Sequence, residues 1–267
     1  MNGQPYTPEG WDYNTNVLTR DVIYNAIDNK DILQGVVESC DANFNLHVNL
    51  GNGIEAIMPR NEIEAINAND NGVPRESLCT GKVHKYVQFM VKELKDDGDV
   101  IISRKDVQQG ALNWIKNDLQ VGQKIQGIVK NIKPYGVFIE IGGGVVGLAH
   151  IEDLSVARIK SPAERVKIGQ KIDVVVKSID RNDGKVILSY KELLGSWEEN
   201  VKNFKEKTKV KGIVRETEKN NNGIFIELTP NLVGMAEYVD GLEYGKEVEV
   251  YIKKIVPDKK KIKLLFV

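Results

Sequence analysis

The sequence has 267 residues, which is enough for two or three domains that each bury a core. Hydrophobic residues make up 41% and charged residues 28%, and the net charge of −1 gives no bulk indication of a nucleic-acid binder. No apolar run approaches the roughly 18 residues that span a bilayer, the N-terminus lacks a signal or myristoylation pattern, and the two cysteines form no disulfide framework. We therefore expect a cytoplasmic protein with no membrane partner.

The chain begins with an N-terminal extension, residues 1–30, in which Trp11 and the apolar spacing of DVIYNAI predict a helix that packs on the next unit. That unit, residues 31–105, contains strand-like segments such as LHVNL, in which apolar and polar residues alternate. A helical period follows at residues 106–120, in GALNWIKNDL. We predict an amphipathic linker helix here, whose Trp114 packs on a neighbouring domain rather than on a ligand.

A second strand-rich unit occupies residues 121–191 and includes the alternating segment GVFIEI. Its segment SPAE, residues 161–164, is a capping box with proline at the first helical position, and predicts a short helix between the third and fourth strands. Residues 192–208 show a helical period again and predict a second linker helix, with Trp197 on its packed face. A third strand-rich unit follows at residues 209–267, where the sequence between the third and fourth strands is too short for such a helix.

The three strand-rich units resemble one another. GVFIEI in the second becomes GIFIEL in the third, and LHVNL supplies the same alternation in the first. Each unit opens on a glycine, Gly35, Gly127 or Gly212, and these glycines are 92 and 85 residues apart. That period is longer than a solenoid repeat, so each unit is a small domain. Five short strands per unit, separated by turn residues, predict a mainly β fold of three tandem five-stranded antiparallel barrels joined by short linker helices.

Three glycines of the second unit satisfy G-x-G-x-x-G, the pattern of a dinucleotide-binding loop: Gly142, Gly144 and Gly147. Such a loop opens a helix, whereas here VVGLAHI follows and has the character of another strand. The glycines after FIEI therefore predict a hairpin turn with positive φ angles. Gly147 is matched by Gly234 and Ala56 in the other units, which indicates close barrel packing rather than a cofactor loop.

The sequence shows no recognisable pattern of a metal site or an active site. Cys40, His47, Cys79 and His84 lie in the first unit, but their spacings fit no common zinc site. Motifs of serine hydrolases, zinc proteases and P-loop enzymes are missing from the sequence. We expect no catalytic residues, no metal and no small-molecule cofactor.

At this point the second unit resembles a known family, the S1 RNA-binding domain, over about 70 residues. The family pattern is an opening glycine, an aromatic-Gly-x-Phe motif, Gly-Leu-x-His and a terminal Leu-Ser-x-Lys. The matching residues are Gly127, Tyr135-Gly136-Val137-Phe138, Gly147-Leu148-Ala149-His150 and Leu188-Ser189-Tyr190-Lys191. The resemblance implies an oligonucleotide-binding (OB) fold, single-stranded RNA as the partner, and the same fold in the first and third units.

The resemblance also implies an RNA-binding face. The family's contact residues fall on Tyr135, Phe138, His150, Asp180 and Lys185, with Arg181 between the last two. A carboxylate near phosphate repels it, so we expect Asp180 to orient Arg181 or Lys185, or to bond a base or hydroxyl.

Alternation along the strands supports this face independently. Because Val137, Ile139 and Ile141 share the core side of GVFIEI, Phe138 points outward. An exposed phenylalanine can be a domain contact, but it also suits base stacking. Lys130 falls on the same outer side and Lys133 in the first loop, so both are added to the predicted RNA-binding residues, as is Phe225 in the third unit.

The units differ in charge. The second has 12 basic and 7 acidic residues, a net charge of +5, whereas the third has +2 and the first −4. In the first unit His47 and Pro59 take the places of Phe138 and His150, which makes it a poor RNA binder and a candidate docking surface for a protein. In the third, Arg215 and the run of lysines at 259–261 are candidates for phosphate contacts, or the run is a solvated hairpin tip.

Three functions fit these observations. The first is a non-enzymatic protein that binds single-stranded RNA, mainly through the second unit, and holds mRNA during translation. The second is an adaptor whose acidic first unit docks the ribosome or an RNA-decay complex. The third is a regulator that binds one transcript.

Overall fold

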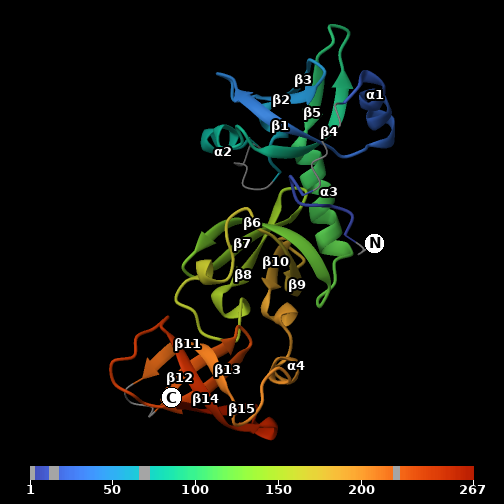
Figure 1. The fold of residues 1–267 in the computed structure, drawn as a ribbon. Coiled ribbons are helices and arrows are strands. Elements are labelled where there is room, and N and C mark those ends of the chain that lie inside the picture. Colours follow the sequence, from blue (N-terminus) through green and yellow to red (C-terminus); the bar gives the residue numbers. More distant parts are fainter. Residues whose placement is uncertain (1–3, 12–17, 66–72, 219–222) are drawn as a thin grey trace. The chain divides into compact units, whose positions relative to one another are not determined.

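The computed structural model describes residues 4–11, 18–65, 73–218 and 223–267, and contains three closed five-stranded barrels (Figure 1). In each barrel the fifth strand lies between the third and the fourth, which is the strand order of the OB fold. The predicted mainly β fold of three tandem barrels is therefore confirmed. One pairing in each barrel, that of the third strand with the fifth, is parallel, and the sequence pattern did not predict it.

The first barrel is preceded by the predicted N-terminal helix. Its elements are α1 (Arg20–Asn29), β1 (Leu33–Cys40), β2 (Leu46–Gly51), β3 (Ile54–Met58), η1 (Arg60–Glu62), α2 (Glu76–Thr80), β4 (Tyr86–Leu94) and β5 (Val100–Ser103). Thr19 caps α1 by accepting a hydrogen bond from the main-chain nitrogen of Val22. Ile23 and Ala26 of α1 are buried in the barrel's core, which confirms that this helix packs on the first unit.

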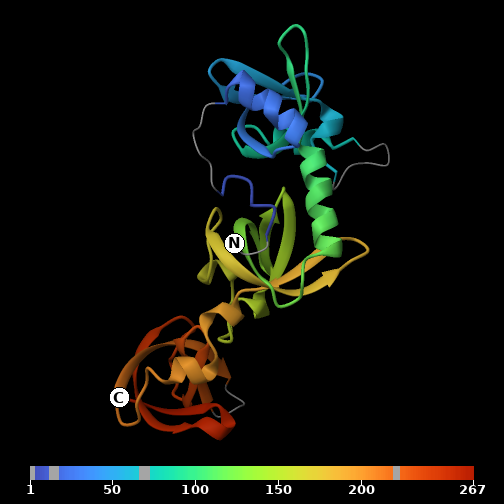
Figure 2. The same cartoon turned by 90° about the vertical axis from the view of Figure 1, so that its right-hand side faces the viewer.

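The helix after the first barrel, α3 (Arg104–Asn117), begins and ends slightly earlier than the predicted linker (Figure 2). Ser103, the last residue of β5, caps it by accepting from the main-chain nitrogen of Asp106, so helix and strand join directly. Trp114 is 7% exposed, and its ring centre lies 6.3 Å from that of Tyr6. The tryptophan therefore packs inside the protein, as expected.

The second barrel contains the short helix and the glycine turn that were predicted from the sequence. Its elements are β6 (Lys124–Lys133), β7 (Gly136–Gly142), β8 (Val145–His150), η2 (Ile151–Asp153), η3 (Pro162–Glu164), β9 (Lys171–Asp180) and β10 (Lys185–Ser189). The capping box of Ser161 and Glu164 is formed, and the helix it starts is a single 3₁₀ turn, which confirms the predicted element between the third and fourth strands.

The β7–β8 turn consists of Gly142, Gly143 and Gly144, whose φ angles are +134°, +55° and +75°. A Cβ on Gly143 would lie 2.8 Å from that of Ala111 in α3, and one on Gly144 would collide with the guanidinium of Arg104. The turn therefore needs glycine for its backbone and for close packing. It forms a hairpin as predicted, and protein atoms cover two of its glycines, so the structure does not support a dinucleotide loop.

Residues 4–11 pack beside this hairpin, which the sequence did not predict. The side-chain amide of Gln4 donates to the carbonyls of Gln126 and Ile141 and accepts from the main-chain nitrogen of Gln126, at 2.7–3.1 Å. The main-chain nitrogen of Glu9 donates to the buried carboxylate of Glu140 at 2.7 Å. The N-terminal segment is thus held by the main chain of β6 and β7 and by the side chain of Glu140.

The third barrel follows a linker that the structure breaks into two pieces. The elements are η4 (Lys191–Leu194), α4 (Trp197–Val201), β11 (Lys209–Glu218), β12 (Gly223–Thr229), β13 (Leu232–Glu237), β14 (Glu247–Val256), η5 (Pro257–Lys259) and β15 (Lys261–Phe266). The predicted continuous linker helix is wrong, because Gly195, with φ +81°, ends the first piece and Ser196 caps the second. Residues 238–246, between β13 and β14, contain no helix, as expected.

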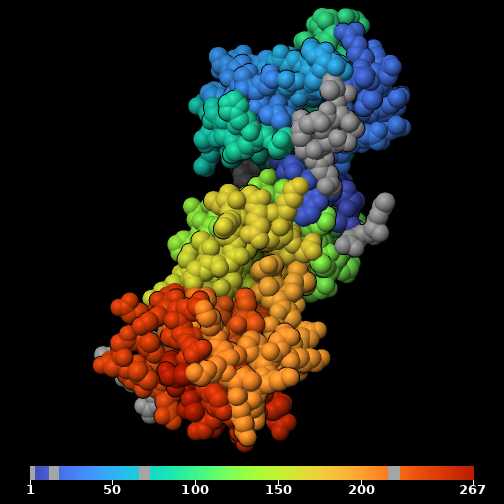
Figure 3. Space-filling model, viewed as in Figure 1, coloured from blue at the N-terminus to red at the C-terminus, as the bar shows by residue number. Residues whose placement is uncertain are grey.

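The packing of this linker agrees with the prediction. Trp197, Val201 and Phe204 lie against the core of the third barrel. Figure 3 shows the linker in orange covering part of the red-orange barrel.

The opening glycines have one structural reason in all three barrels. A Cβ on Gly35 would lie 2.6 Å from a side-chain carbon of Val48, and Gly127 and Gly212 face Ile139 and Ile226 in the same way. In each case the second strand of the barrel crosses the first closely enough to exclude a side chain. The opening glycine therefore recurs in the sequence because the same close contact between two strands recurs in each barrel.

By their contacts the residues form two compact units, and the second barrel contributes to both. The first consists of Met1–Ile128, Ile139–Gly147 and Ile179–Val186, and the second of Val129–Phe138, Leu148–Ser178 and Ile187–Val267. The predicted aromatic contacts of the second barrel thus belong to one unit, and its β9–β10 loop belongs to the other.

Candidate nucleic-acid interface

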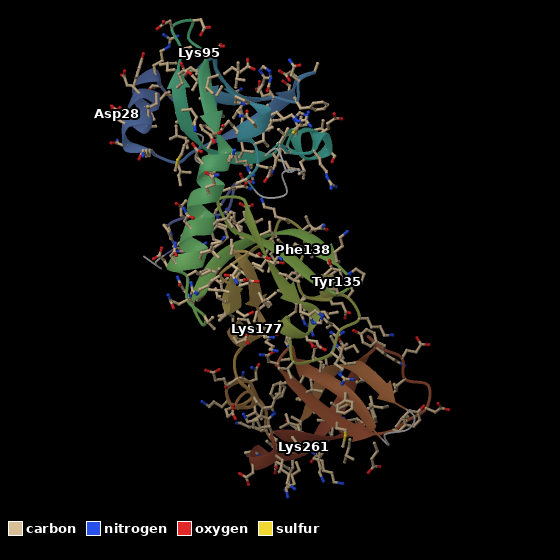
Figure 4. All side chains as sticks on the ribbon, turned by 180° about the vertical axis from the view of Figure 1, so that it is seen from behind. Asp28, Lys95, Tyr135, Phe138, Lys177 and Lys261 are labelled. Atoms are coloured by element: carbon tan, nitrogen blue, oxygen red, sulfur yellow. The ribbon has the colours of Figure 1, made fainter. Side chains whose placement is uncertain are left out.

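The aromatic pair is the centre of the candidate interface. Tyr135 lies in the β6–β7 turn and is 50% exposed, and Phe138 lies on β7 and is half-buried. Their ring centres are 6.1 Å apart and the rings are nearly perpendicular, at 83° (Figure 4). The neighbours Val137 and Ile139 are fully buried, so Phe138 is on the outer side of the strand, as alternation predicted.

The strand contacts around this pair bring it close to the end of β8. A Cβ on Gly136 would lie 2.5 Å from the carbonyl oxygen of Ala149, so the glycine allows β7 and β8 to approach closely. The carbonyl of Tyr135 accepts a hydrogen bond of 2.9 Å from the nitrogen of Ile151. His150, just before Ile151, is thereby held next to the aromatic turn.

His150 is exposed and begins the 3₁₀ turn η2. Its Nδ1 accepts from the main-chain nitrogen of Glu152 at 3.4 Å, and the Glu152 carboxylate lies 3.8 Å from the same atom. A ring nitrogen that accepts carries no proton, so in this arrangement Nε2 carries it and can donate to a base or phosphate. Lys130 and Lys133 are both exposed on β6, as the predicted phosphate contacts require.

The β9–β10 loop holds the other predicted contacts, and its polar groups have partners within the protein. The carboxylate of Asp180 accepts from the main-chain nitrogens of Asn182 and Asp183, at 3.0 and 3.3 Å. It therefore shapes the turn instead of orienting the two basic side chains. Lys185 lies 2.5 Å from the Asp183 carboxylate, which raises the pKa of the lysine, and the Asp180 charge adds to this effect.

Arg181 occupies a structural position. Its guanidinium donates to the carbonyls of Lys116 and Leu119, at 2.5 and 3.2 Å. These carbonyls are at the C-terminal end of α3, where a helix lacks internal donors and where its dipole favours a cation. The sequence predicted an RNA contact here and gave no sign of this capping role, because the helix end lies more than 60 residues away.

The third barrel keeps part of the aromatic face. Phe225 is half-buried on β12, and its cross-strand neighbour on β13 is Met235, which is 45% exposed. Asn222, the counterpart of Tyr135, lies outside the described residues. Lys260 pairs with Glu198 of α4 at 2.8 Å.

Arg215 is not available to phosphate, contrary to the sequence-based expectation. It is 7% exposed and binds two carboxylates, those of Glu227 and Glu164, each at 2.5 Å. Glu227 also binds Arg165, from the β8–β9 connection, at 2.6 Å. These four side chains form a network of ion pairs that joins the β8–β9 connection to the third barrel.

Asn231 strengthens the same junction. Its side chain accepts from the main-chain nitrogen of Val156 at 3.1 Å and donates to the carbonyls of Lys191 and Gly195 at 2.6 and 2.8 Å. It is 6% exposed, so these three bonds replace the water that its amide loses on burial.

The first barrel has a different outer face. His47, at the position of Phe138, binds the Glu55 carboxylate at 2.5 Å and lies 3.8 Å from that of Asp41. The described residues contain no group of three or more potential metal ligands. Within the same ranges, no helix is long and apolar enough to cross a membrane.

Sequence reasoning missed a charged cluster at the end of β8. Asp153 is buried and binds the side chains of both Lys177 and Lys191. The available signal was the terminal Ser-x-Lys, whose lysine is Lys191, but the sequence does not show that a lysine of β9 and an aspartate of η2 meet it.

Comparison with known proteins gives one family. Residues 118–191 match the family model of the S1 RNA binding domain. The chain is 30% identical over 253 residues to the small ribosomal subunit protein bS1 of Pseudomonas aeruginosa, covering 88% of this chain and 43% of that protein. It is 34% identical over 196 residues to bS1 of Staphylococcus aureus, covering 67% and 49% respectively. The chain thus spans less than half the length of these relatives.

Solved structures similar to the chain include the solution structure of GSP13 from Bacillus subtilis. The match covers 30% of this chain and 61% of the GSP13 chain, with 26% identity and a TM-score of 0.29.

Proposed function

Because residues 118–191 are an S1 RNA-binding domain, we propose that the chain is a non-enzymatic protein that binds single-stranded RNA, above all mRNA during translation. The observation that carries the proposal is the pair of the exposed Tyr135 and the half-buried Phe138, whose rings contact each other beside His150. Bases stack on such rings with about 1–3 kcal/mol each and little sequence preference. Relatives named as ribosomal proteins support the link to translation.

The charge distribution supports a main role for the second barrel. Its net charge of +5 favours the RNA backbone, whereas the first barrel has −4. Lys130 and Lys133 are exposed on the strand that leads into the aromatic turn, so phosphates can be bound next to stacked bases. The third barrel contributes Phe225 as a single stacking residue.

The test is a fluorescence titration of single-stranded RNA with the wild type and with Tyr135→Ala/Phe138→Ala. Loss of two stacked bases should cost at least about 2 kcal/mol, which weakens binding roughly 30-fold. Tyr24→Ala is the matched control, since Tyr24 is a 56% exposed tyrosine of α1. If the double variant binds as tightly as the wild type at physiological salt, the stacking face is wrong.

The alternative is an adaptor, and the acidic first barrel favours it. There the Phe138 position is filled by His47, whose ring is bound to the Glu55 carboxylate. We propose that this barrel contacts the ribosome. Co-sedimentation of the Tyr135→Ala/Phe138→Ala chain with ribosomes would support the adaptor, whereas loss of sedimentation together with RNA affinity would support RNA binding alone.

A further inference from the structure

The buried carboxylate of Asp153 gathers two lysines from different elements. Lys177 of β9 donates to both its oxygens, at 2.7 and 2.8 Å. Lys191, which follows β10, donates to Oδ1 at 3.1 Å and to the carbonyl of Glu152 at 3.1 Å. Since both ammonium groups contact the same oxygen, they lie close enough together to share one anion. Figure 4 shows Lys177 on its strand.

The two ammonium groups of this cluster are held in place by one buried carboxylate. Burial would raise the pKa of Asp153, but the hydrogen bonds from the two lysines outweigh it and lower the pKa, so the group is ionised at neutral pH. The hydrogen bond to Asp153 raises the pKa of Lys177, so it stays cationic. At hydrogen-bond distance one carboxylate thus faces two ammonium groups, and the charges of Glu192 and Glu152 add a weaker attraction to Lys177. The side chains of Lys177 and Lys191 are 50% and 32% exposed, so both reach solvent while Asp153, at 4%, does not.

The other two barrels provide internal comparisons. In the first, the counterpart of Lys177 is Lys92, which binds a further acid, Asp106, at 2.9 Å. In the third, the counterpart is the exposed Lys253, and Val267 stands where the second lysine would be. Among the described residues of these two barrels, no two lysines share one buried carboxylate in this way. A cluster needed only to hold the barrel together would be expected in all three.

A hollow adjoins the cluster. It has a volume of about 510 Å³, and its polar lining consists of Glu152, Ser155, Arg158 and Lys191. Ile151 and Val156 contribute an apolar part, and Val156 is 59% exposed. Ile151 directly follows the histidine of the candidate interface. A nucleic-acid strand that leaves the aromatic pair at the end of β8 therefore comes next to the hollow and to Lys191.

We propose that Lys177 and Lys191 bind a backbone phosphate of single-stranded RNA, with the hollow between Ser155 and Arg158 accepting the attached nucleoside. The inference rests on the proposed RNA-binding function and extends its site from the aromatic pair to the β8–β9 connection. Asp153 is a positioning residue: it holds the two ammonium groups and does not touch the RNA. Because the two ammonium groups contact a phosphate and no base, this part of the site binds RNA without sequence specificity.

The salt dependence of binding tests this directly. Affinity of the full chain for a single-stranded oligonucleotide is measured from low to physiological salt for Lys177→Gln, Lys191→Gln and the control Lys253→Gln. Loss of one phosphate contact should lower the slope of log affinity against log salt by about 0.7 and weaken binding equally for different sequences. If both variants behave like Lys253→Gln, the proposal fails. The proposed function fails separately, when Tyr135→Ala/Phe138→Ala binds like the wild type.

Lysine labelling of the wild type gives a second test that does not depend on how the variants fold. Lys177 and Lys191 should be protected from acylation when RNA is added, whereas Lys253 should react as before. Equal labelling with and without RNA would overturn the proposal. Equal protection by inorganic phosphate at the same ionic strength would also overturn it, because it would indicate an anion site without preference for RNA.

Discussion

A buried ion pair joins the N-terminal segment to α3. Glu9 is 6% exposed and accepts from Nε and Nη2 of Arg104, at 2.6 and 3.1 Å. The main-chain nitrogen of Gln88 donates to the same carboxylate at 3.1 Å. Arg104 is 2% exposed and binds a second acid, Glu64, at 2.8 Å. Each carboxylate therefore has a partner inside the protein, and the guanidinium has no access to water.

We predict that Glu9→Gln destabilises this region and removes much of its acid sensitivity. Burial alone would raise the pKa of Glu9, but Arg104, with a smaller contribution from Lys82, lowers it from 4.5 to about 2. A lowered pKa in the folded state stabilises the protein fully above pH 4.5, and that stabilisation is lost as the pH falls from 4.5 towards 2. The difference corresponds to about 3 kcal/mol.

Amide hydrogen exchange of α3 measures the effect locally, which suits a chain of several domains. In the wild type the opening free energy of α3 should fall by about 3 kcal/mol in acid. Glu9→Gln should start lower at pH 7 and change little with pH. Asp28→Asn, which removes an exposed carboxylate of α1, is the control. A variant with the wild-type pH dependence would refute the assignment of the acid sensitivity to this ion pair.

Three further substitutions test the packing and the roles of single side chains. Gly136→Ala should lower the melting temperature measured by calorimetry, because its Cβ would lie 2.5 Å from the carbonyl of Ala149, and overpacking costs about 1–3 kcal/mol. Glu227→Gln should leave Arg165 without its carboxylate partner and Arg215 with Glu164 alone, cost roughly 3–5 kcal/mol and speed proteolysis of the third barrel. Arg181→Ala should speed amide exchange in the last turn of α3 with little change in RNA affinity; the opposite pattern would assign the guanidinium to RNA.

The barrels were predictable because their signals are local. Alternation in GVFIEI places Ile139 in the core and Phe138 outside, and the same period recurs twice along the chain. The capping box at Ser161 lies within four residues and forms as predicted. The predicted linker helix at 192–208 is longer than the observed one. The apolar spacing continues across Gly195, and it does not show that this glycine has a positive φ.

The features that were missed depend on contacts between distant residues. Gln4 and Glu9 lie in a segment without periodicity, and their partners in β6 and β7 are more than 100 residues away. Arg215 was expected to face phosphate because it is basic and lies on a strand in an RNA-binding fold. Its partners are Glu227 on the neighbouring strand β12 and Glu164 from another domain. Neither partner can be read from the sequence around the arginine.

These contacts also change the meaning of the charge of the second barrel. The net charge of +5 counts every basic residue equally. In the structure Arg165 is bound to Glu227, Arg181 caps a helix and Lys185 is paired with Asp183. We therefore expect the charge that contacts RNA to lie mainly on the lysines near the aromatic turn and on Lys177 and Lys191. Such a distribution predicts that RNA affinity depends less on salt concentration than the net charge of +5 would suggest. It also predicts that substitution of Lys177 reduces this dependence.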